Sequence, residues 1–259
     1  MIGLIKERKS RKNTETFLAS SERYEVLQKL GEGSYGVAYL LFDKNTEQNV
    51  VLKRLKGKHL HPAGYEKFQQ EICFLKKLQQ FAVPKVLTDG MIGESPFYIM
   101  TYADGLTFEE AIFLKNKIFS IEETIYFTNK LLLIIQQIHL TGIVHRDLRI
   151  PNILLKDDEL TIIDFGLASN IDWHTNTANI EDPKKIPHPI SDLYAIGHFM
   201  LFLLYSSFEP TTKKGTTWQQ ELALPSSLQR FIERLLTITE PFTHCTEAIA
   251  ELRQIQKEI

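Results

Sequence analysis

The sequence has few of the features that mark disulfide-stabilised, zinc-binding or nucleic-acid-binding proteins. Its 259 residues include only two cysteines, Cys73 and Cys245, which lie far apart and lack the paired spacing of a zinc site. The formal net charge is -2, because 30 basic and 32 acidic side chains are interspersed. We therefore expect no nucleic-acid partner, and the scarcity of cysteine favours a reducing, cytoplasmic compartment.

Long apolar runs are also missing. The longest, residues 193–208, is shorter than the roughly 18 residues of a membrane span, and it contains Gly197 and His198. It predicts a buried core helix, with no integral membrane segment. Residues 1–20 carry charges where a secretory signal needs an unbroken apolar stretch, so no signal peptide is expected.

The hydrophobic content of 43% is enough for a sizeable core, and no internal repeat or low-complexity segment interrupts the chain. Residues 1–22 are different, because the basic cluster at 6–12 has no apolar periodicity. They predict a basic, polar, solvated N-terminal arm, and the alternative is a docking or autophosphorylated tail that uses Ser10, Thr14 or Thr16.

The remaining chain, 23–259, changes character near residue 102. Three β-rich segments in 24–53, a helix after Pro62 and a strand at 97–100 predict a small β-rich lobe over about 23–102. The helix carries apolar residues at helical spacing, namely Phe68, Ile72, Leu75 and Leu78.

The following part, about 103–259, predicts a mainly helical large lobe. It begins with a long apolar helix over 121–140, continues with short strands at 153–155 and 161–163, and ends in further helices. The expected fold class is therefore α+β, in two lobes.

Residues 31–36 match G-x-G-x-x-G, a spacing that lets backbone amides approach phosphate oxygens closely. A dinucleotide-binding fold would need a helix directly afterwards, yet residues 37–42 are strand-like. The pattern is typical of a phosphate-binding loop between two strands, and a plain glycine hairpin is the alternative.

Lys53 ends an apolar strand segment, where a buried ammonium group is costly unless it meets anions. Glu71 is a candidate partner. It lies one helical turn before Leu75, so both side chains face the same direction.

The most specific pattern is H-R-D-x-x-x-x-N at residues 145–152, followed by D-F-G at 164–166. With the features above, it resembles the eukaryotic-type (Hanks-type) serine/threonine protein kinases from about Tyr24 to the end of the chain. The short length and the sequence 149–152 are most similar to the short soluble members from bacteria.

The resemblance implies ATP as cosubstrate, bound between the two lobes, with Mg²⁺ as the metal and Mn²⁺ as the alternative. It implies that Asp147 orients or accepts the proton of the acceptor hydroxyl and that Arg149 contacts the γ-phosphate. Asn152 and Asp164, both hard oxygen ligands, would hold the metal. Asp192 would fix the backbone of the catalytic loop, unless it serves only as a helix N-cap.

The same resemblance implies a nucleotide site in the small lobe. Lys53 would grip the α- and β-phosphates, Glu71 would hold Lys53 in place, and Met100 would be the gatekeeper. The implied nucleotide-binding residues are Leu30, Gly31, Gly33, Gly36, Ala38, Lys53, Glu71, Met100, Thr101, Tyr102 and Ala103.

Several residues depart from the family pattern. Ala38 replaces the usual valine beneath the adenine, and Arg149 replaces the lysine typical of Ser/Thr kinases, which blurs the choice between Ser/Thr and Tyr. Pro151 replaces a glutamate that is typical of kinases with basic substrates. No Ala-Pro-Glu follows the D-F-G motif, and Glu181 is the nearest stand-in.

Arg146, directly before Asp147, indicates control by phosphorylation, with Ser169, Thr175 and Thr177 as candidates and an ordinary polar loop as the alternative. Two other functions remain open: a small-molecule kinase of the aminoglycoside-phosphotransferase type, and a pseudokinase scaffold. The expected partner is a protein substrate, and the expected oligomeric state is a monomer or weak dimer.

Overall fold

The computed structural model describes residues 2–33, 35–177, 180–208 and 216–259. The chain divides into two compact units, Met1–Ala103 and Asp104–Ile259.

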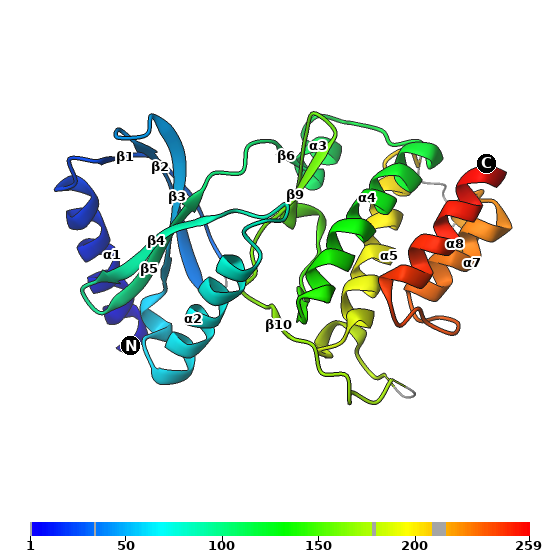
Figure 1. Ribbon diagram of the computed structural model, residues 1–259. Helices are drawn as coiled ribbons and strands as arrows, with labels where there is room; N and C mark the ends of the chain where they lie inside the picture. Colours follow the sequence, from blue (N-terminus) through cyan, green and yellow to red (C-terminus); the bar gives the residue numbers. More distant parts are fainter. Residues whose placement is uncertain (1, 34, 178–179, 209–215) are drawn as a thin grey trace. The chain divides into compact units, whose positions relative to one another are not determined.

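A five-stranded antiparallel sheet forms the frame of the first unit, in the spatial order β1-β2-β3-β5-β4 (Figure 1). Its strands are β1 (Tyr24–Glu32), β2 (Gly36–Asp43), β3 (Gln48–Leu55), β4 (Val86–Ile92) and β5 (Ser95–Thr101). Its helices are α1 (Ile2–Ala19), the 3-10 turn η1 (Gly57–His59) and α2 (Pro62–Lys77). The strands predicted in 24–53 and at 97–100 are confirmed, whereas β4 lies where the sequence predicts no element.

Helix α2 begins at a well-defined cap. The His61 ring nitrogen Nδ1 accepts a hydrogen bond from the Gly64 N–H at 3.2 Å, and Pro62 occupies the first helical turn, where no N–H is needed. The four apolar residues predicted to share one face of this helix are all buried. The predicted helix after Pro62 is thus confirmed, together with its buried face.

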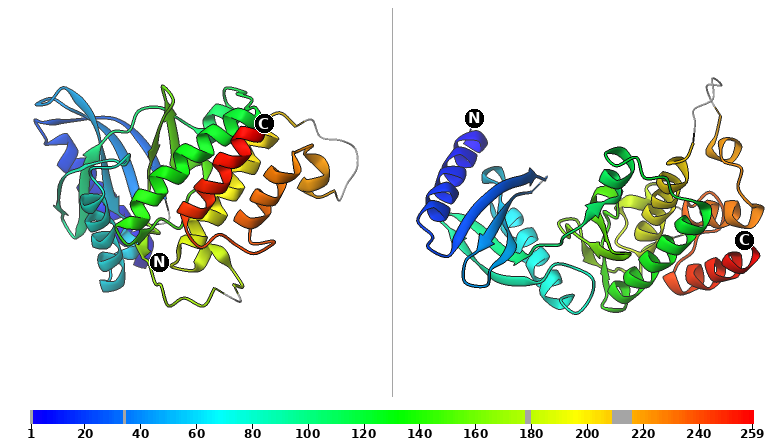
Figure 2. Two further views of the ribbon diagram at one scale, coloured as in Figure 1. Left: turned by 45° about the vertical axis from the view of Figure 1, so that its right-hand side comes forward. Right: turned by 90° about the horizontal axis from the view of Figure 1, so that it is seen from above.

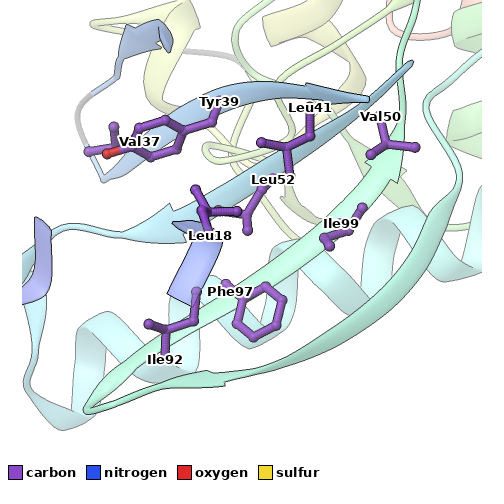
Figure 3. Close-up of a cluster of buried hydrophobic side chains, with 9 residues drawn as sticks. All are labelled: Leu18, Val37, Tyr39, Leu41, Val50, Leu52, Ile92, Phe97 and Ile99. Carbon is purple, nitrogen blue, oxygen red and sulfur yellow. The ribbon is translucent and has the colours of Figure 1, made fainter. Parts of the chain in front are cut away.

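The two faces of the sheet carry different residues because side chains alternate along each strand. One face holds a buried apolar cluster to which α1 contributes Leu18 (Figure 3). On the other face Tyr98 lies opposite Lys53 and packs against Phe68 of α2, with ring centroids 5.4 Å apart. Helices α1 and α2 therefore cover opposite faces. The apolar cluster consists of Leu18, Val37, Tyr39, Leu41, Val50, Leu52, Ile92, Phe97 and Ile99.

The N-terminal segment differs from the solvated arm expected over residues 1–22. Residues 2–19 are helical, and Ser10 and Thr14 are buried against the sheet. Glu7 Oε1 accepts a hydrogen bond at 2.7 Å from Nη2 of Arg54, a β3 residue with only 1% exposure. The helix docks mainly through polar contacts and a few apolar residues at its end, so apolar periodicity does not reveal it.

The second unit is mainly helical, with a three-stranded sheet in the order β6-β8-β9 and a two-stranded pair, β7 with β10. The strands are β6 (Leu106–Thr107), β7 (Ile143–Val144), β8 (Ile153–Lys156), β9 (Glu159–Ile162) and β10 (Ser169–Asn170). The α-helices are α3 (Phe108–Phe113), α4 (Ile121–Leu140), α5 (Pro189–Tyr205), α6 (Trp218–Glu221), α7 (Ser226–Leu235) and α8 (Cys245–Glu258). Two 3-10 turns, η2 (Ile150–Asn152) and η3 (Pro183–Lys185), precede β8 and α5.

Helix α4 coincides with the predicted helix 121–140, and the two predicted short strands are confirmed by the β8–β9 hairpin. Helices α4, α5 and α8 lie side by side (Figures 1 and 2). Helix α5 has buried residues on nearly all sides, as predicted for a core helix in the apolar run at 193–208. Among the described residues, no helix combines the length and the apolarity that crossing a membrane requires.

Candidate active site

Three of the expected nucleotide-binding residues lie in one row across the sheet of the first unit. Gly31 of β1 pairs with Ala38 of β2, and Ala38 pairs with Lys53 of β3. Residues directly opposite one another on neighbouring strands project to the same face. This face is the one that α2 covers, opposite the face occupied by α1.

Lys53 forms the expected ion pair with Glu71. Lys53 Nζ lies 2.6 Å from Glu71 Oε1, and the two side chains are 12% and 3% exposed. A carboxylate buried to this extent on α2 needs a cationic or hydrogen-bonding partner, and Lys53 supplies it. The pair fixes the position of the ammonium group on the sheet.

The glycine-rich turn depends on Gly36 for its close approach to β3. A Cβ atom at Gly36 would lie 2.9 Å from Lys53 Cε, a separation that real Cβ atoms do not tolerate. At Gly31 and Gly33, by contrast, an added Cβ would meet no atom within 4 Å. Ser34, in the middle of the motif, lies outside the described residues. Gly31 and Gly33 leave open space beside the backbone, which is what a phosphate-binding turn requires.

The expected hinge begins at the end of β5. Met100 and Thr101 are its last residues, and the Thr101 N–H donates to the Lys85 carbonyl at 2.9 Å. Since that N–H is engaged, the peptide groups of Tyr102 and Ala103 are better candidates for contact with a base. Leu30, on β1, has an exposed side chain.

In the second unit, Asp192 holds the backbone of the predicted catalytic loop, residues 145–152. It is fully buried on α5, and its two carboxylate oxygens accept hydrogen bonds from the N–H groups of His145 (2.8 Å) and Arg146 (2.7 Å). His139 of α4 adds a third contact, with Nε2 2.9 Å from Oδ2. The N-cap of α5 is His188, so Asp192 is not a helix cap.

These contacts also set the charge of Asp192. Burial alone would raise its pKa, but the hydrogen bonds from His139 and from the loop backbone outweigh burial, so the pKa lies below its usual range. The carboxylate is therefore ionised. It stabilises a loop in which Arg146 has a positive φ of 65°, a conformation that is unfavourable for arginine.

His145 is buried in a defined tautomer. Its Nδ1 accepts a hydrogen bond from the Asp147 N–H at 3.2 Å, so Nε2 carries the proton and donates to the Ile163 carbonyl at 3.2 Å. Burial lowers the pKa of this imidazole, which keeps it neutral. The ring also meets Phe165 edge to face, with centroids 4.6 Å apart, and so connects the two motifs.

The Asp147 carboxylate is surrounded by N–H donors. Arg149 donates through Nε to Oδ1 at 2.7 Å and through Nη2 to Oδ2 at 3.2 Å. Asn152 Nδ2 donates to Oδ2 at 3.0 Å. The main contact, with Asp147, raises the pKa of Arg149 above its usual value. Arg149, predicted to contact the γ-phosphate, and Asn152, predicted to hold the metal, are thus both in contact with the predicted catalytic aspartate.

The β8–β9 hairpin brings Asn152 and Asp164 to the same end of the small sheet. Ile153 pairs with Ile162, and the Ile163 N–H donates to the Asn152 carbonyl at 3.0 Å. Asn152 is therefore bonded through its backbone to the residue directly before Asp164. Asn152 uses its amide nitrogen toward Asp147, which leaves Oδ1 as an acceptor. Among the described residues there is no cluster of three or more His, Cys, Asp or Glu side chains suited to a metal.

Comparisons with known proteins decide the family. A family model described as "Protein kinase domain" matches residues 24–241. The chain belongs to the protein kinase domain family. The resemblance inferred from the residues around Asp147 and Asp164 is therefore confirmed.

Relatives of this protein kinase occur in bacteria and in eukaryotes. The chain is 33% identical over 232 residues to a probable serine/threonine-protein kinase YbdM of Bacillus subtilis, covering 89% of this chain and 88% of that protein. It is 26% identical over 253 residues to the serine/threonine-protein kinase PknD of Protochlamydia amoebophila, covering 92% of this chain but 25% of the relative. A third relative, the serine/threonine-protein kinase Nek6 of rice, is 31% identical over 196 residues.

The segment between the D-F-G motif and α5 carries Glu181, the nearest stand-in for the glutamate of the missing Ala-Pro-Glu motif. Glu181 is exposed and has no ion-pair partner among the described residues. Arg234 of α7 pairs with Glu247 and Glu251 of α8. Aromatic rings connect the segment to the helices, because Trp173 stacks on His244 with centroids 5.4 Å apart.

The three candidate phosphorylation sites differ in access. Ser169 lies in β10, and its hydroxyl oxygen is buried without a hydrogen-bond partner among the described residues. Thr175 and Thr177 are half-buried. Arg146, the residue expected to sense a phosphate, donates from Nη2 to the Lys185 carbonyl at 2.7 Å.

Two contributors to the site have no signal in the motifs. His139 stabilises Asp192 from the last turn of α4, and the only hint in the sequence is a polar ring in an otherwise apolar helix. Arg54 follows Lys53 directly and is buried on the opposite face of the sheet, where α1 covers it. A sequence motif cannot reveal either role, because both depend on contacts between distant segments.

Proposed function

We propose that this protein kinase transfers the γ-phosphoryl group of ATP to serine or threonine hydroxyls of protein substrates, including its own chain. The observation that carries the proposal is the Asp147 carboxylate, presented by a loop that Asp192 fixes and bonded directly to Arg149 and Asn152. The preference for serine and threonine is supported by the names of the relatives, which are called serine/threonine-protein kinases.

The first unit would bind the nucleotide. Lys53, held by Glu71, would contact the α- and β-phosphates, and the backbone at Gly31 and Gly33 would approach phosphate oxygens. Leu30, Gly36 and Ala38 would lie against the nucleotide, and the segment of Met100, Thr101, Tyr102 and Ala103 would hold the adenine through its backbone.

The donor set of the second unit fits a hard divalent cation, which we infer to be Mg²⁺, with Mn²⁺ as a substitute. Asn152 Oδ1 and the Asp164 carboxylate are oxygen ligands, and Mg²⁺ commonly takes few protein ligands and completes its shell with phosphate oxygens and water. When bound, the cation would neutralise developing charge on the phosphate oxygens.

Asp147 would act on the acceptor hydroxyl. As the hydroxyl oxygen bonds to the γ-phosphorus and the bond to the ADP oxygen breaks, the hydroxyl proton passes to a carboxylate oxygen of Asp147. Arg149 occupies both carboxylate oxygens in this structure, yet 66% of its side chain is exposed. It can therefore turn from Asp147 toward the transferred phosphoryl group, where its forked donors match phosphate geometry.

We also infer a cytoplasmic protein that works as a monomer or weak dimer. Both cysteines of the chain are free thiols, as a reducing compartment favours. Size-exclusion chromatography with light scattering tests the oligomeric state.

Labelled ATP with Mg²⁺ or Mn²⁺, a mixed peptide library and mass-spectrometric mapping of the labelled sites test the proposal. We expect label on serine and threonine. Asp147→Asn should lower transfer by about 10²–10⁴-fold while ATP still binds, and Lys53→Ala should impair both. Undiminished transfer by Asp147→Asn would refute the assigned role, and label on tyrosine alone would refute the residue class.

A further inference from the structure

A pocket of about 420 Å³ opens in the second unit beside Asp147. The catalytic loop lines it with Asp147 and Pro151, α5 lines it with Phe199 and Phe202, and the end of α3 contributes Phe113. Because Asp147 is assigned to the acceptor hydroxyl, an occupant of this pocket lies next to the acceptor.

The pocket is bordered by large aromatic side chains that are exposed to water. Phe113 and Phe202 are 61% and 45% exposed. A second hollow of about 340 Å³ shares both residues and continues along α5 to Tyr205, so the two hollows adjoin. Contiguous exposed apolar surface of this kind marks a place where another molecule binds.

The charges at the pocket disfavour a basic ligand. Arg146, Arg149 and Lys184 line it, against the carboxylates of Asp147 and Glu109. The Asp147 carboxylate is already paired with Arg149. A lysine or arginine side chain entering here would be repelled by the cationic side chains and would lose hydration against the apolar ones. An apolar side chain would incur neither of these free-energy costs.

One polar atom of the lining lacks a partner. His198 of α5 lines both hollows, and its Nε2 is buried without a hydrogen-bond partner among the described residues. Its ring is held by Tyr194, with centroids 4.8 Å apart. Burial, with Lys184 nearby, lowers the pKa of this imidazole, so the ring is neutral near pH 7. A ligand with a hydroxyl or N–H at its edge would satisfy this atom.

We propose that this pocket binds a bulky apolar side chain of the protein substrate close to the acceptor residue, most favourably an aromatic one whose polar edge reaches His198. The proposal rests on the proposed kinase function, which places the acceptor at Asp147. Since an extended chain advances about 3.3 Å per residue, the recognised side chain lies within roughly four residues of the acceptor. Selection by the pocket then makes the kinase prefer apolar over basic sequences.

Binding of labelled peptides to the full chain, followed by fluorescence anisotropy, tests the pocket without requiring phosphoryl transfer. The peptides carry one serine in an alanine-rich background, with Phe, Tyr, Leu or Arg placed at each flanking position in turn. At one position we expect Phe and Leu to bind at least about tenfold more tightly than Ala or Arg, and Tyr more tightly than Phe. Equal affinities at every position, or a preference for Arg, would overturn the proposal.

Substitutions locate the effect. Phe202→Glu should abolish the apolar preference and favour Arg, and His198→Phe should remove the advantage of Tyr over Phe. Leu140→Glu is the matched control, because it adds the same charge at an exposed leucine that lines neither hollow. An unchanged preference in Phe202→Glu, with thermal unfolding showing a folded protein, would refute the pocket.

Transfer with ATP to the same peptides separates the two claims. Transfer without sequence preference would refute the pocket and leave the kinase function standing. Selective binding without transfer to any peptide would refute the proposed function, and the pocket would remain a peptide-binding site.

Discussion

The Asp192 carboxylate contributes to stability because both of its oxygens are engaged by neighbouring groups. Both oxygens accept hydrogen bonds from backbone N–H groups of the catalytic loop, and His139 contacts the same carboxylate. Asparagine keeps one acceptor oxygen, but its amide nitrogen would face an N–H donor. We expect Asp192→Asn to lower the free energy of unfolding by about 1–3 kcal/mol at pH 7 and to reduce phosphoryl transfer.

The pH dependence of this loss follows from the lowered pKa of Asp192. A carboxyl group whose pKa is lower in the folded than in the unfolded state stabilises the fold above its unfolded pKa, and this contribution disappears as the pH falls through the folded pKa. The stability difference between wild type and Asp192→Asn should therefore shrink as the pH is lowered from about 5 toward 3. Urea unfolding across this range measures it, and a difference that stays constant would contradict the assigned charge.

At the scale of elements, helix α1 stabilises the first unit by neutralising Arg54. Glu7 accepts from Arg54 Nη2 at 2.7 Å and from the Gly57 N–H at 2.5 Å, and Glu7 is 28% exposed. Glu7→Gln would leave the buried guanidinium without its carboxylate. We expect a loss of about 1–3 kcal/mol in the free energy of unfolding, less than for a fully buried pair.

Glu15→Gln is the matched control on the same helix. Glu15 pairs with Arg11 at 3.6 Å, and both side chains are largely exposed. Surface pairs of this kind contribute about 0–1 kcal/mol, so the substitution should change the urea midpoint little. Equal effects of the two substitutions would show that α1 does not stabilise the sheet through Arg54.

The sequence predicts those elements whose apolar residues repeat regularly. Helices α2 and α4 and the strands β2 and β3 are of this kind, because their own residues form the buried face. Helix α1 is different, since a buried arginine in β3 determines where Glu7 lies. The packing of Trp173 on His244 is likewise invisible in the sequence, because it joins segments that are far apart in the chain.

For the whole molecule, the sequence predicts those parts of the candidate site whose residues lie close together in the chain, because the chemistry requires particular residue types at a fixed spacing. The loop with Asp147, Arg149 and Asn152 is such a case, and the structure brings these residues into contact. The substrate-side lining could not be predicted. Phe113 and Phe202 come from α3 and α5, and only the folding of the second unit brings both into one pocket.

The candidate phosphate-binding lysine, Lys53, lies in the first unit, and the candidate metal ligand Asp164 lies in the second. Their contributions can be separated by measuring how much ATP raises the unfolding midpoint of the whole chain with and without Mg²⁺. A ligand that binds only the folded state adds about 2.7 kcal/mol at a hundred times its Kd, enough to raise the unfolding midpoint by roughly 5 °C for a chain of this size. Lys53→Ala should lose the ATP-induced rise both with Mg²⁺ and with EDTA.

Asp164→Asn should lose only the additional rise that Mg²⁺ provides, because it removes a metal ligand and leaves Lys53 in place. Asp157→Asn, the same change at an exposed turn residue of the β8–β9 hairpin, should behave like wild type. If Asp164→Asn kept the full Mg²⁺-dependent rise, Asp164 would not be a metal ligand.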